Sequence, residues 1–329
     1  MSRTTIALAT FHGARFLPAQ LESLAAQSCG DFTILARDDG SFDDTRRALD
    51  AAARRDPRIE ILEDDADRLG ASGNYGRLLQ AAFERGAERF FLCDQDDVWR
   101  PDKVARQLEA LDAAEALHGR ETPLLVHTDL EVVDRDLAVI HPSFLKYQGL
   151  RHEATDPLRT LCVQNFATGC TMLANRALVQ RALPIPEEAV MHDWWLAIAA
   201  AATGKLLFLP EATVRYRQHG GNRLGAQSYR RFLRRLPARL AQWNWDWSPD
   251  FLATVRQVAA LANRLSDRPE SQRLLEEYLD IFAAPRSGWR RSGDVRRLGV
   301  RRQDAVRNAL LHAKLWLAPR DLPDGVTRP

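Results

Sequence analysis

The feature that most constrains this chain is a regular alternation, over its first hundred residues, of short apolar runs with amphipathic segments of helical length. The apolar runs are TTIALAT, FTILAR, RIEIL and RFFLC, and the segments between them lie near 15–27, 43–54 and 73–85. Strands that alternate with helices predict βαβ units with parallel strand pairing. The runs contain few polar residues, as expected for strands that helices cover on both faces. The sequence therefore predicts an α/β fold with a mostly parallel, Rossmann-like sheet flanked by helices.

The pattern changes in the second half of the chain. A helix near 101–117 and a strand at LLVHTDLEVVD are followed by a strand at GCTMLAN, a helix at MHDWWLAIAAAA and two short strands, LLFLP and ATVRYR. Beyond Gly225 the chain becomes helical and rich in arginine and tryptophan. We expect an α/β domain over residues 1–226 and a helical, basic, Trp-rich C-terminal extension over residues 227–329.

Composition narrows the class of protein. A chain of 329 residues that is 45% hydrophobic can bury a large core, which excludes disorder and collagen. No apolar run reaches the roughly 18 residues that span a bilayer, and the N-terminus lacks a signal peptide, so a cytoplasmic protein is expected. The four cysteines lack the paired spacing of a zinc site and are predicted to be reduced core thiols: Cys29, Cys93, Cys162 and Cys170.

Polar clusters follow three of the predicted strands. They are His12-Gly13, the segment DDGS at 38–41 and the segment DQDD at 94–97. In an open α/β sheet, ligands bind at the carboxyl ends of the strands. Three carboxylates in four residues repel one another unless a cation offsets their charge, which favours a divalent metal beside phosphate oxygens. The alternative is a solvated acidic turn.

The second acidic loop admits two interpretations as well. Asp39 could form an Asx turn or cap the next helix. If Asp43 or Asp44 caps that helix instead, Asp39 is free to contact a nucleotide.

Taken together, these motifs resemble those of the family-2 glycosyltransferases with the GT-A fold. The segments LATFHGARFLPAQLESLAAQSCGDFTILARDDGS and FLCDQDDVWRPDKV carry the resemblance, and DQDDVW, VHTDLEVVD, TGCTMLANR, HDWWLA and YRQHGGN are similar to the bacterial rhamnosyltransferase group. The resemblance covers about residues 4–225. The chain departs from the family pattern at Phe11, where tyrosine is usual, and at His12, where asparagine is common.

The resemblance implies roles for individual residues. Asp193 matches the catalytic base, and Asp96 is the better candidate for direct metal contact. His219 matches a position where related enzymes hold the metal or the diphosphate from a C-terminal loop. Asn165 is a further position near the acceptor, and His127 and Asp129 could face the same cleft or make structural hydrogen bonds. The nucleotide and donor pocket is implied at Thr10, Phe11, Asp39, Asp94, Gln95 and Asp96, and the acceptor sugar pocket at Trp194, Trp195, His192, Thr168 and Gly169.

The chemistry at Asp193 can also be argued from the residues. An alcohol attacks an anomeric carbon only as its proton leaves, which requires a base within hydrogen-bonding reach. At the first turn of a helix the dipole would lower the pKa of Asp193 and keep it ionised, and Trp194 and Trp195 could form an apolar wall for sugar rings. The alternative is a helix N-cap beside two core indoles, with His192 orienting Asp193.

The C-terminal extension has two interpretations. From Arg230 to the end the chain has 20 basic and 11 acidic residues. These could lie on an anionic membrane surface, at the inner face of the membrane, where a polyprenyl-linked acceptor would be presented. Alternatively, its tryptophans pack into the core or a dimer partner: Trp243, Trp245, Trp247, Trp289 and Trp316.

These observations predict an inverting glycosyltransferase that requires magnesium or manganese. The resemblance implies L-rhamnose from dTDP-L-rhamnose as the sugar and a saccharide in surface polysaccharide biosynthesis as the acceptor; nucleic acid is not an expected partner. Alternatives are a UDP- or GDP-sugar donor, a nucleotidyltransferase or metal phosphohydrolase, and a non-catalytic glycan-binding scaffold.

Overall fold

The computed structural model describes residues 3–64, 68–220, 225–241, 247–283 and 285–319. Within these residues the strands form one nine-stranded sheet in the order β3-β2-β1-β4-β8-β6-β9-β5, with β7 paired to β6. The strands are β1 (Thr4–Thr10), β2 (Thr33–Asp38), β3 (Ile59–Ile61), β4 (Arg89–Asp94), β5 (Val98–Trp99), β6 (Leu124–Val133), β7 (Val139–His141), β8 (Leu173–Asn175) and β9 (Lys205–Arg217).

The first four strands position the site. β1 pairs in parallel with β2 on one side and with β4 on the other, and β2 pairs in parallel with β3. The strand order therefore reverses at β1, and in open α/β sheets ligands bind at such a reversal, beyond the carboxyl ends of the strands. The three predicted polar clusters lie at this edge. The α/β fold with a Rossmann-like parallel core is confirmed, although β5, β7 and β8 run antiparallel to their neighbours.

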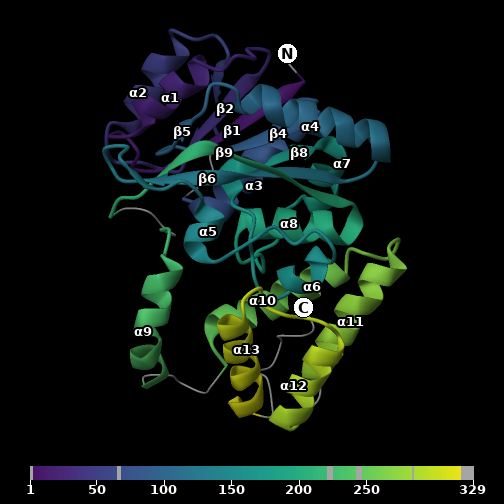
Figure 1. The fold of residues 1–329 in the computed structure, drawn as a ribbon. Coiled ribbons are helices and arrows are strands. Elements are labelled where there is room, and N and C mark those ends of the chain that lie inside the picture. The colour runs from purple at the N-terminus through teal and green to yellow at the C-terminus, as the bar shows by residue number, and fades with distance from the viewer. Residues whose placement is uncertain (1–2, 65–67, 221–224, 242–246, 284, 320–329) are drawn as a thin grey trace.

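Helices cover both faces of the sheet (Figure 1). One face carries α1 (Leu17–Ala25), α2 (Thr45–Ala53) and α4 (Lys103–His118), and the other α3 (Gly70–Glu84), α7 (Arg176–Ala182) and α8 (His192–Thr203). Two short helices, α5 (Phe144–Gln148) and α6 (Pro157–Leu161), lie between β7 and β8 in the chain. The second face continues into the extension, whose helices are α9 (Tyr229–Ala241), α10 (Pro249–Ala262), α11 (Pro269–Ala283), α12 (Gly288–Arg297) and α13 (Ala305–Leu317).

Two predicted elements differ in the structure. GCTMLAN is not one strand, because residues Gly169–Thr171 form a 3-10 turn before the short strand β8. LLFLP and ATVRYR are one long strand, β9, whose pairing with β6 shifts register around Asp129. The local irregularity at Pro210 explains why the sequence suggested two strands. All four cysteines are free, as expected; three are buried, whereas Cys29 is partly exposed.

The extension shares its core with the α/β domain. One hydrophobic cluster contains Leu196 and Ile198 of α8 together with Phe251 and Val255 of α10. The boundary at residue 226 stays a prediction, since this buried cluster extends across it. No helix among the described residues is long and apolar enough to cross a membrane.

The tryptophans of the extension fall into two groups. Trp247 is buried beside Phe251, whereas the side chains of Trp289 and Trp316 are each 63% exposed. Trp243 and Trp245 lie outside the described residues. Core packing therefore accounts for Trp247 and leaves the indoles of α12 and α13 on the surface.

Candidate active site

The loop after β1 is joined to the loop after β4 by the side chain of Gln95. Its amide oxygen accepts a hydrogen bond from the Phe11 backbone N–H at 2.8 Å, and its amide nitrogen donates to the Phe11 carbonyl at 2.7 Å. Gly13 permits this contact, because a Cβ there would lie 2.1 Å from the Gln95 amide oxygen. The guanidinium carbon of Arg68 lies 3.9 Å from the centre of the Phe11 ring. Gln95 thus holds the Phe11 loop in place, a role that its expected place in the nucleotide and donor pocket did not include.

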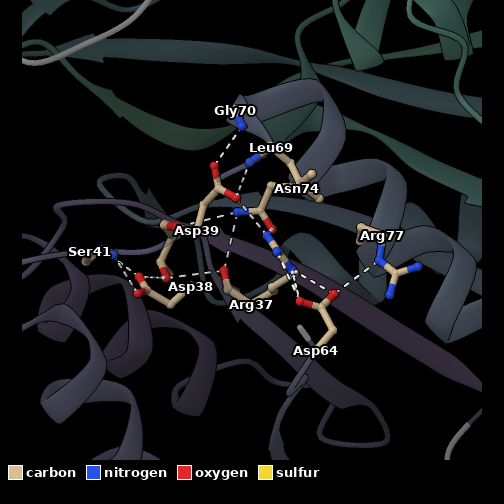
Figure 2. A network of polar contacts seen from close by, with 10 residues as sticks. Arg37, Asp38, Asp39, Ser41, Asp64, Leu69, Gly70, Asn74 and Arg77 are labelled. Carbon is tan, nitrogen blue, oxygen red and sulfur yellow. Dashed lines mark hydrogen bonds and ion pairs between the residues drawn. The ribbon is translucent and has the colours of Figure 1, made fainter. Parts of the chain in front are cut away.

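Asp39 is held in a buried polar network, shown in Figure 2. Its carboxylate forms a 2.8 Å ion pair with Arg37 and accepts the backbone N–H groups of Leu69 and Gly70 at 2.8 and 2.7 Å. Arg37 also pairs with Asp64 at 3.1 Å. The expectation that Asp39 would be left free is wrong, because its carboxylate caps the N-terminus of α3.

Asp38 and Asp43, on either side of Asp39, form the turn and the helix-start contact that were one interpretation of Asp39. Asp38 accepts hydrogen bonds from the backbone N–H and the hydroxyl of Ser41, and from the hydroxyl of Thr10 at 3.0 Å. Asp43 accepts from the backbone N–H of Thr45 at the start of α2. Thr10 and Asp39 nevertheless both line the main cavity, and their assignment to a nucleotide pocket stays a prediction.

The carboxylates after β4 face different partners. Asp94 accepts the hydroxyl of Tyr75 at 2.7 Å, and Asp96 lies 2.8 Å from Nε2 of His219. Asp97 is fully buried and accepts the backbone N–H of Arg217 at 3.1 Å. β9 therefore delivers His219 to the acidic loop, across 123 residues of sequence.

The electrostatics of this loop fit a cation. Burial, reinforced by the negative charge of Asp96, raises the pKa of Asp94 to about 7, and burial raises the pKa of Asp97 well above its usual range. Carboxylate oxygens and an imidazole nitrogen are suitable ligands for Mn²⁺ or Mg²⁺. Asp94, Asp97 and Cys170 also lie close enough to share an ion. Asp96 and His219 suit Mg²⁺ or Mn²⁺ better, because a cysteine sulfur is a soft ligand that selects softer metals.

Asp193 lies in the first turn of α8, as the sequence predicts. One carboxylate oxygen accepts the Trp194 backbone N–H at 2.6 Å and the other accepts the Gly169 N–H at 3.2 Å. A Cβ at Gly169 would lie 2.9 Å from Nε2 of His192 and 3.4 Å from Cβ of Asp193, so only glycine permits this close packing. The 3-10 turn at Gly169 thus orients Asp193, and His192 stacks on Tyr75 with ring centres 3.9 Å apart.

Two expectations about this helix are wrong. Burial raises the pKa of Asp193 to about 6, because desolvation outweighs the backbone hydrogen bonds at the helix start that lower it. The indoles do not form a sugar wall. Trp195 is fully buried and donates to the Ala182 carbonyl, and Trp194 donates to the Leu161 carbonyl. Neither is among the residues that line the cavity.

The other predicted residues either have structural partners or lie outside the described residues. His127 is buried and hydrogen-bonded to His152 at 3.0 Å, and Asp129 accepts the Leu145 N–H, so both have structural partners away from the cavity. Gly221 and Asn222, the last two residues of the motif YRQHGGN, lie outside the described residues.

One cavity of about 650 Å³ connects the predicted loops. Its lining includes these predicted residues: Thr10, Phe11, Asp39, Asp94, Gln95, Asp96, Asn165, Thr168, Gly169, His192 and Asp193. Sequence reasoning missed the following lining residues: Arg68, Asn74, Tyr75, Phe144, Gln148, Leu150, Tyr216, Phe232 and Arg307. A volume of this size suits a ligand with several rings. Tyr216 begins the motif YRQHGGN on β9, whereas the other missed residues come from helices and loops without a local motif.

Comparisons with known proteins agree with this geometry. Residues 5–120 match the sequence model of "Glycosyl transferase family 2". The dTDP-rhamnosyl transferase RfbG of Shigella flexneri is 22% identical over 79% of this chain and 85% of its own length. An uncharacterized glycosyltransferase of a Nostoc species is 25% identical over 67% of this chain and 66% of its own length.

Solved structures share the fold at low identity. S. aureus TarS 1–349 in complex with UDP-GlcNAc superposes with a TM-score of 0.52 and 14% identity, over 91% of this chain and 71% of that one. GalNAc-T7 with UDP, GalNAc and Mn²⁺ gives a TM-score of 0.52 and 13% identity, over 83% of this chain and 51% of that one. At such identities the likeness concerns the fold alone.

Proposed function

The chain carries a family-2 glycosyltransferase domain with the GT-A fold, and on this premise we propose that it is an inverting, metal-dependent enzyme that transfers L-rhamnose from dTDP-L-rhamnose. The acceptor is a saccharide of a surface polysaccharide. The observation that carries the proposal is that Asp193 lines the same cavity as Asp94 and Asp96. The proposed base and the proposed metal site therefore lie on the walls of the same cavity.

The mechanism follows from these positions. Asp193 accepts the proton of the acceptor hydroxyl as its oxygen attacks the anomeric carbon. Asp96 and His219, with Asp94 beside them, would hold a divalent cation, which when bound neutralises the charge on the departing nucleoside diphosphate. Thr10 and Phe11 line the same cavity and would contact the base, next to the start of α3 that the Asp39 carboxylate holds.

Inversion follows from a count of the carboxylates. The acidic side chains that line the cavity in the described residues are Asp39, Asp94, Asp96 and Asp193. Asp39 is committed to Arg37 and the start of α3, and Asp94 and Asp96 to the metal site. With Asp193 as the proposed base, no uncommitted carboxylate remains among the described lining residues to act as the nucleophile of a double displacement, which supports a single displacement with inversion.

The donor is proposed from the relative RfbG, which is described as a dTDP-rhamnosyl transferase. We expect dTDP and dTDP-L-rhamnose with Mg²⁺ to raise the melting temperature by about 5 °C at a hundredfold excess over Kd, because they bind only the native state. UDP and GDP compounds serve as controls in the same thermal-shift panel. A larger rise in melting temperature with a UDP or GDP compound would contradict dTDP-L-rhamnose as the donor. No rise with any nucleotide would favour a non-catalytic scaffold.

The pH profile provides a second prediction. Asp193 works only as the carboxylate, and burial raises its pKa to about 6. We therefore expect kcat/KM to fall about tenfold per pH unit below pH 6 and to level off above it. Transfer should be measured from pH 4.5 to 8 at two Mg²⁺ concentrations. If the apparent pKa of the acidic limb changes with the Mg²⁺ concentration, the titrating group belongs to the metal site, which would contradict the assignment to Asp193.

We also propose that the extension rests on an anionic membrane at its cytoplasmic face, where a polyprenyl-linked acceptor would be presented. The surface of α9 carries four exposed arginines, Arg230, Arg231, Arg234 and Arg235. The exposed indoles of Trp289 and Trp316 add amphipathic rings of the kind that favour membrane interfaces.

Co-sedimentation with vesicles tests this contact. We expect binding to vesicles with a quarter phosphatidylglycerol at low salt, and none to pure phosphatidylcholine. Replacing Arg234 and Arg235 with glutamine should weaken binding at least tenfold, since each charge near the surface contributes about 1 kcal/mol. Equal sedimentation of the variant, or of the intact chain with neutral vesicles, would contradict an electrostatic contact.

A further inference from the structure

The C-terminal extension helps to build one wall of the cavity that Asp193 lines. Phe232 of α9 and Arg307 of α13 line the same cavity as Asp193. They face it together with Gln148 and Leu150, which lie at and just after the end of α5. The extension therefore completes the pocket of the transferase domain. We call the group Gln148, Leu150, Phe232 and Arg307 the extension wall.

Hydrogen bonds hold this wall in a fixed arrangement. The Arg307 guanidinium donates to the Gln148 carbonyl at 2.7 Å and to the Gly149 carbonyl at 3.2 Å. It also forms a 3.0 Å ion pair with Asp304, which accepts the Tyr229 hydroxyl at 2.9 Å. α13, the end of α5 and the start of α9 are thus fastened to one another, so the wall forms as the chain folds.

Gly149 shows how closely these segments pack. Its φ of 65° is in the left-handed region, and a Cβ at this position would lie 2.8 Å from the Tyr229 ring. The guanidinium carbon of Arg307 lies 5.0 and 5.2 Å from the ring centres of Tyr229 and Phe232. A stacked guanidinium between carbonyls and aromatic rings is a rigid element.

The chemistry of the wall favours an uncharged ligand. The charge of Arg307 is offset by Asp304, and several of its N–H groups are already committed to carbonyls. Phe232 and Leu150 supply apolar surface, and the side chain of Gln148 supplies a neutral amide donor and acceptor. Apolar faces next to neutral hydrogen-bonding groups match a pyranose ring, which has hydroxyls at its rim and C–H groups on its faces.

We propose that the extension wall is the acceptor subsite and that it binds a neutral sugar ring of the acceptor. This inference rests on the proposed transferase function, because Asp193 would face the hydroxyl of that ring. It replaces the predicted wall of Trp194 and Trp195, whose indoles donate to backbone carbonyls and do not line the cavity.

Saturation-transfer NMR with simple glycosides tests the proposal. The probes are the methyl glycosides of L-rhamnose, D-glucose, D-galactose, D-mannose and N-acetyl-D-glucosamine, with dTDP and Mg²⁺ present. We expect the full chain to bind at least one of them, and Phe232→Ala to weaken that binding about tenfold. Leu233→Ala is the matched control, because Leu233 is the next residue of α9, is exposed, and is absent from the cavity lining. It should bind as the unaltered chain does.

A second variant keeps the result interpretable if Phe232→Ala fails to fold. Gln148→Ala removes the amide and leaves the backbone carbonyl that Arg307 needs. Unchanged glycoside binding in a folded Phe232→Ala or Gln148→Ala chain would overturn the proposal, as would the absence of glycoside binding in an unaltered chain that binds dTDP. Glycoside binding that depends on Phe232 in a chain that binds no nucleotide would overturn the transferase function and keep the saccharide subsite.

Discussion

Replacing Asp193 with asparagine will lower the rate of sugar transfer by about 10² to 10⁴-fold, the range that a general base contributes. Asparagine has nearly the same shape as aspartate but cannot take up a proton. Its side-chain oxygen can still accept the N–H of Trp194 or Gly169, so the start of α8 should keep its geometry. We propose Asp193 as the base for the acceptor hydroxyl, and nucleotide binding should therefore stay within about twofold of the unaltered chain.

Two measurements separate the chemical role from a structural one. Transfer is followed by release of dTDP, and nucleotide binding by thermal shift in the same buffer. Asp250→Asn is the matched control, since Asp250 also lies in the first turn of a helix, α10, but is exposed. Equal losses of transfer and nucleotide binding in Asp193→Asn would remove the base assignment, and so would full activity.

The position of Asp193 illustrates what a sequence can predict. The helix start and the acidic residue were both visible in HDWWLA, and the resemblance supplied the role. The direction of the pKa shift was wrong because it depends on burial by segments far away in the chain, whereas the helix dipole is a local property. The contact with Gly169 is similarly non-local, since it depends on a 3-10 turn where the apolar pattern indicated a strand.

The strand-end loops were predictable for a different reason. In a βαβ fold the carboxyl ends of parallel strands share one edge, so the order of motifs alone places Thr10, Asp39 and Asp94 together. The partners of these side chains were not predictable. Asp39 caps α3 by accepting the backbone N–H groups of Leu69 and Gly70, about thirty residues away in the chain. The spacing of apolar residues along the sequence predicts that a side chain is buried, but it does not predict which other side chains it contacts. This is why Trp195 was assigned to the cavity and lies in the core.

The extension was the least predictable part. Its helices and its charge could be read from composition, but Phe232 and Arg307 carry no motif that links them to the cavity. Their contribution depends on how α9 and α13 dock onto α5. Long-range hydrogen bonds such as that from Arg307 to the Gln148 carbonyl, 159 residues apart, determine this docking.

Replacing Asp96 with asparagine should abolish the metal dependence of nucleotide binding. Asp96 lies 2.8 Å from His219, and these two side chains come from loops that only the folded sheet brings together. Asparagine keeps an oxygen but loses the negative charge that a divalent cation requires. We expect the Mg²⁺-dependent part of dTDP affinity to fall by at least the roughly 10–100-fold seen when a residue supporting a metal ligand is lost. The metal-independent part, due to the base pocket, should remain.

Titration of dTDP with and without Mg²⁺, monitored by thermal shift, measures the Mg²⁺-dependent and the metal-independent parts of the dTDP affinity. Asp136→Asn, at an exposed acidic position, controls for the change in net charge. Cys170→Ala distinguishes the two possible metal sites. An ion shared by Asp94, Asp97 and Cys170 would require the thiol. An ion held by Asp96 and His219 would not. Retained metal dependence in Asp96→Asn together with its loss in Cys170→Ala would move the cation to the deeper site. The opposite pattern is expected, because a cysteine sulfur is a soft ligand that suits Mg²⁺ poorly, whereas Asp96 lines the cavity where the diphosphate would lie.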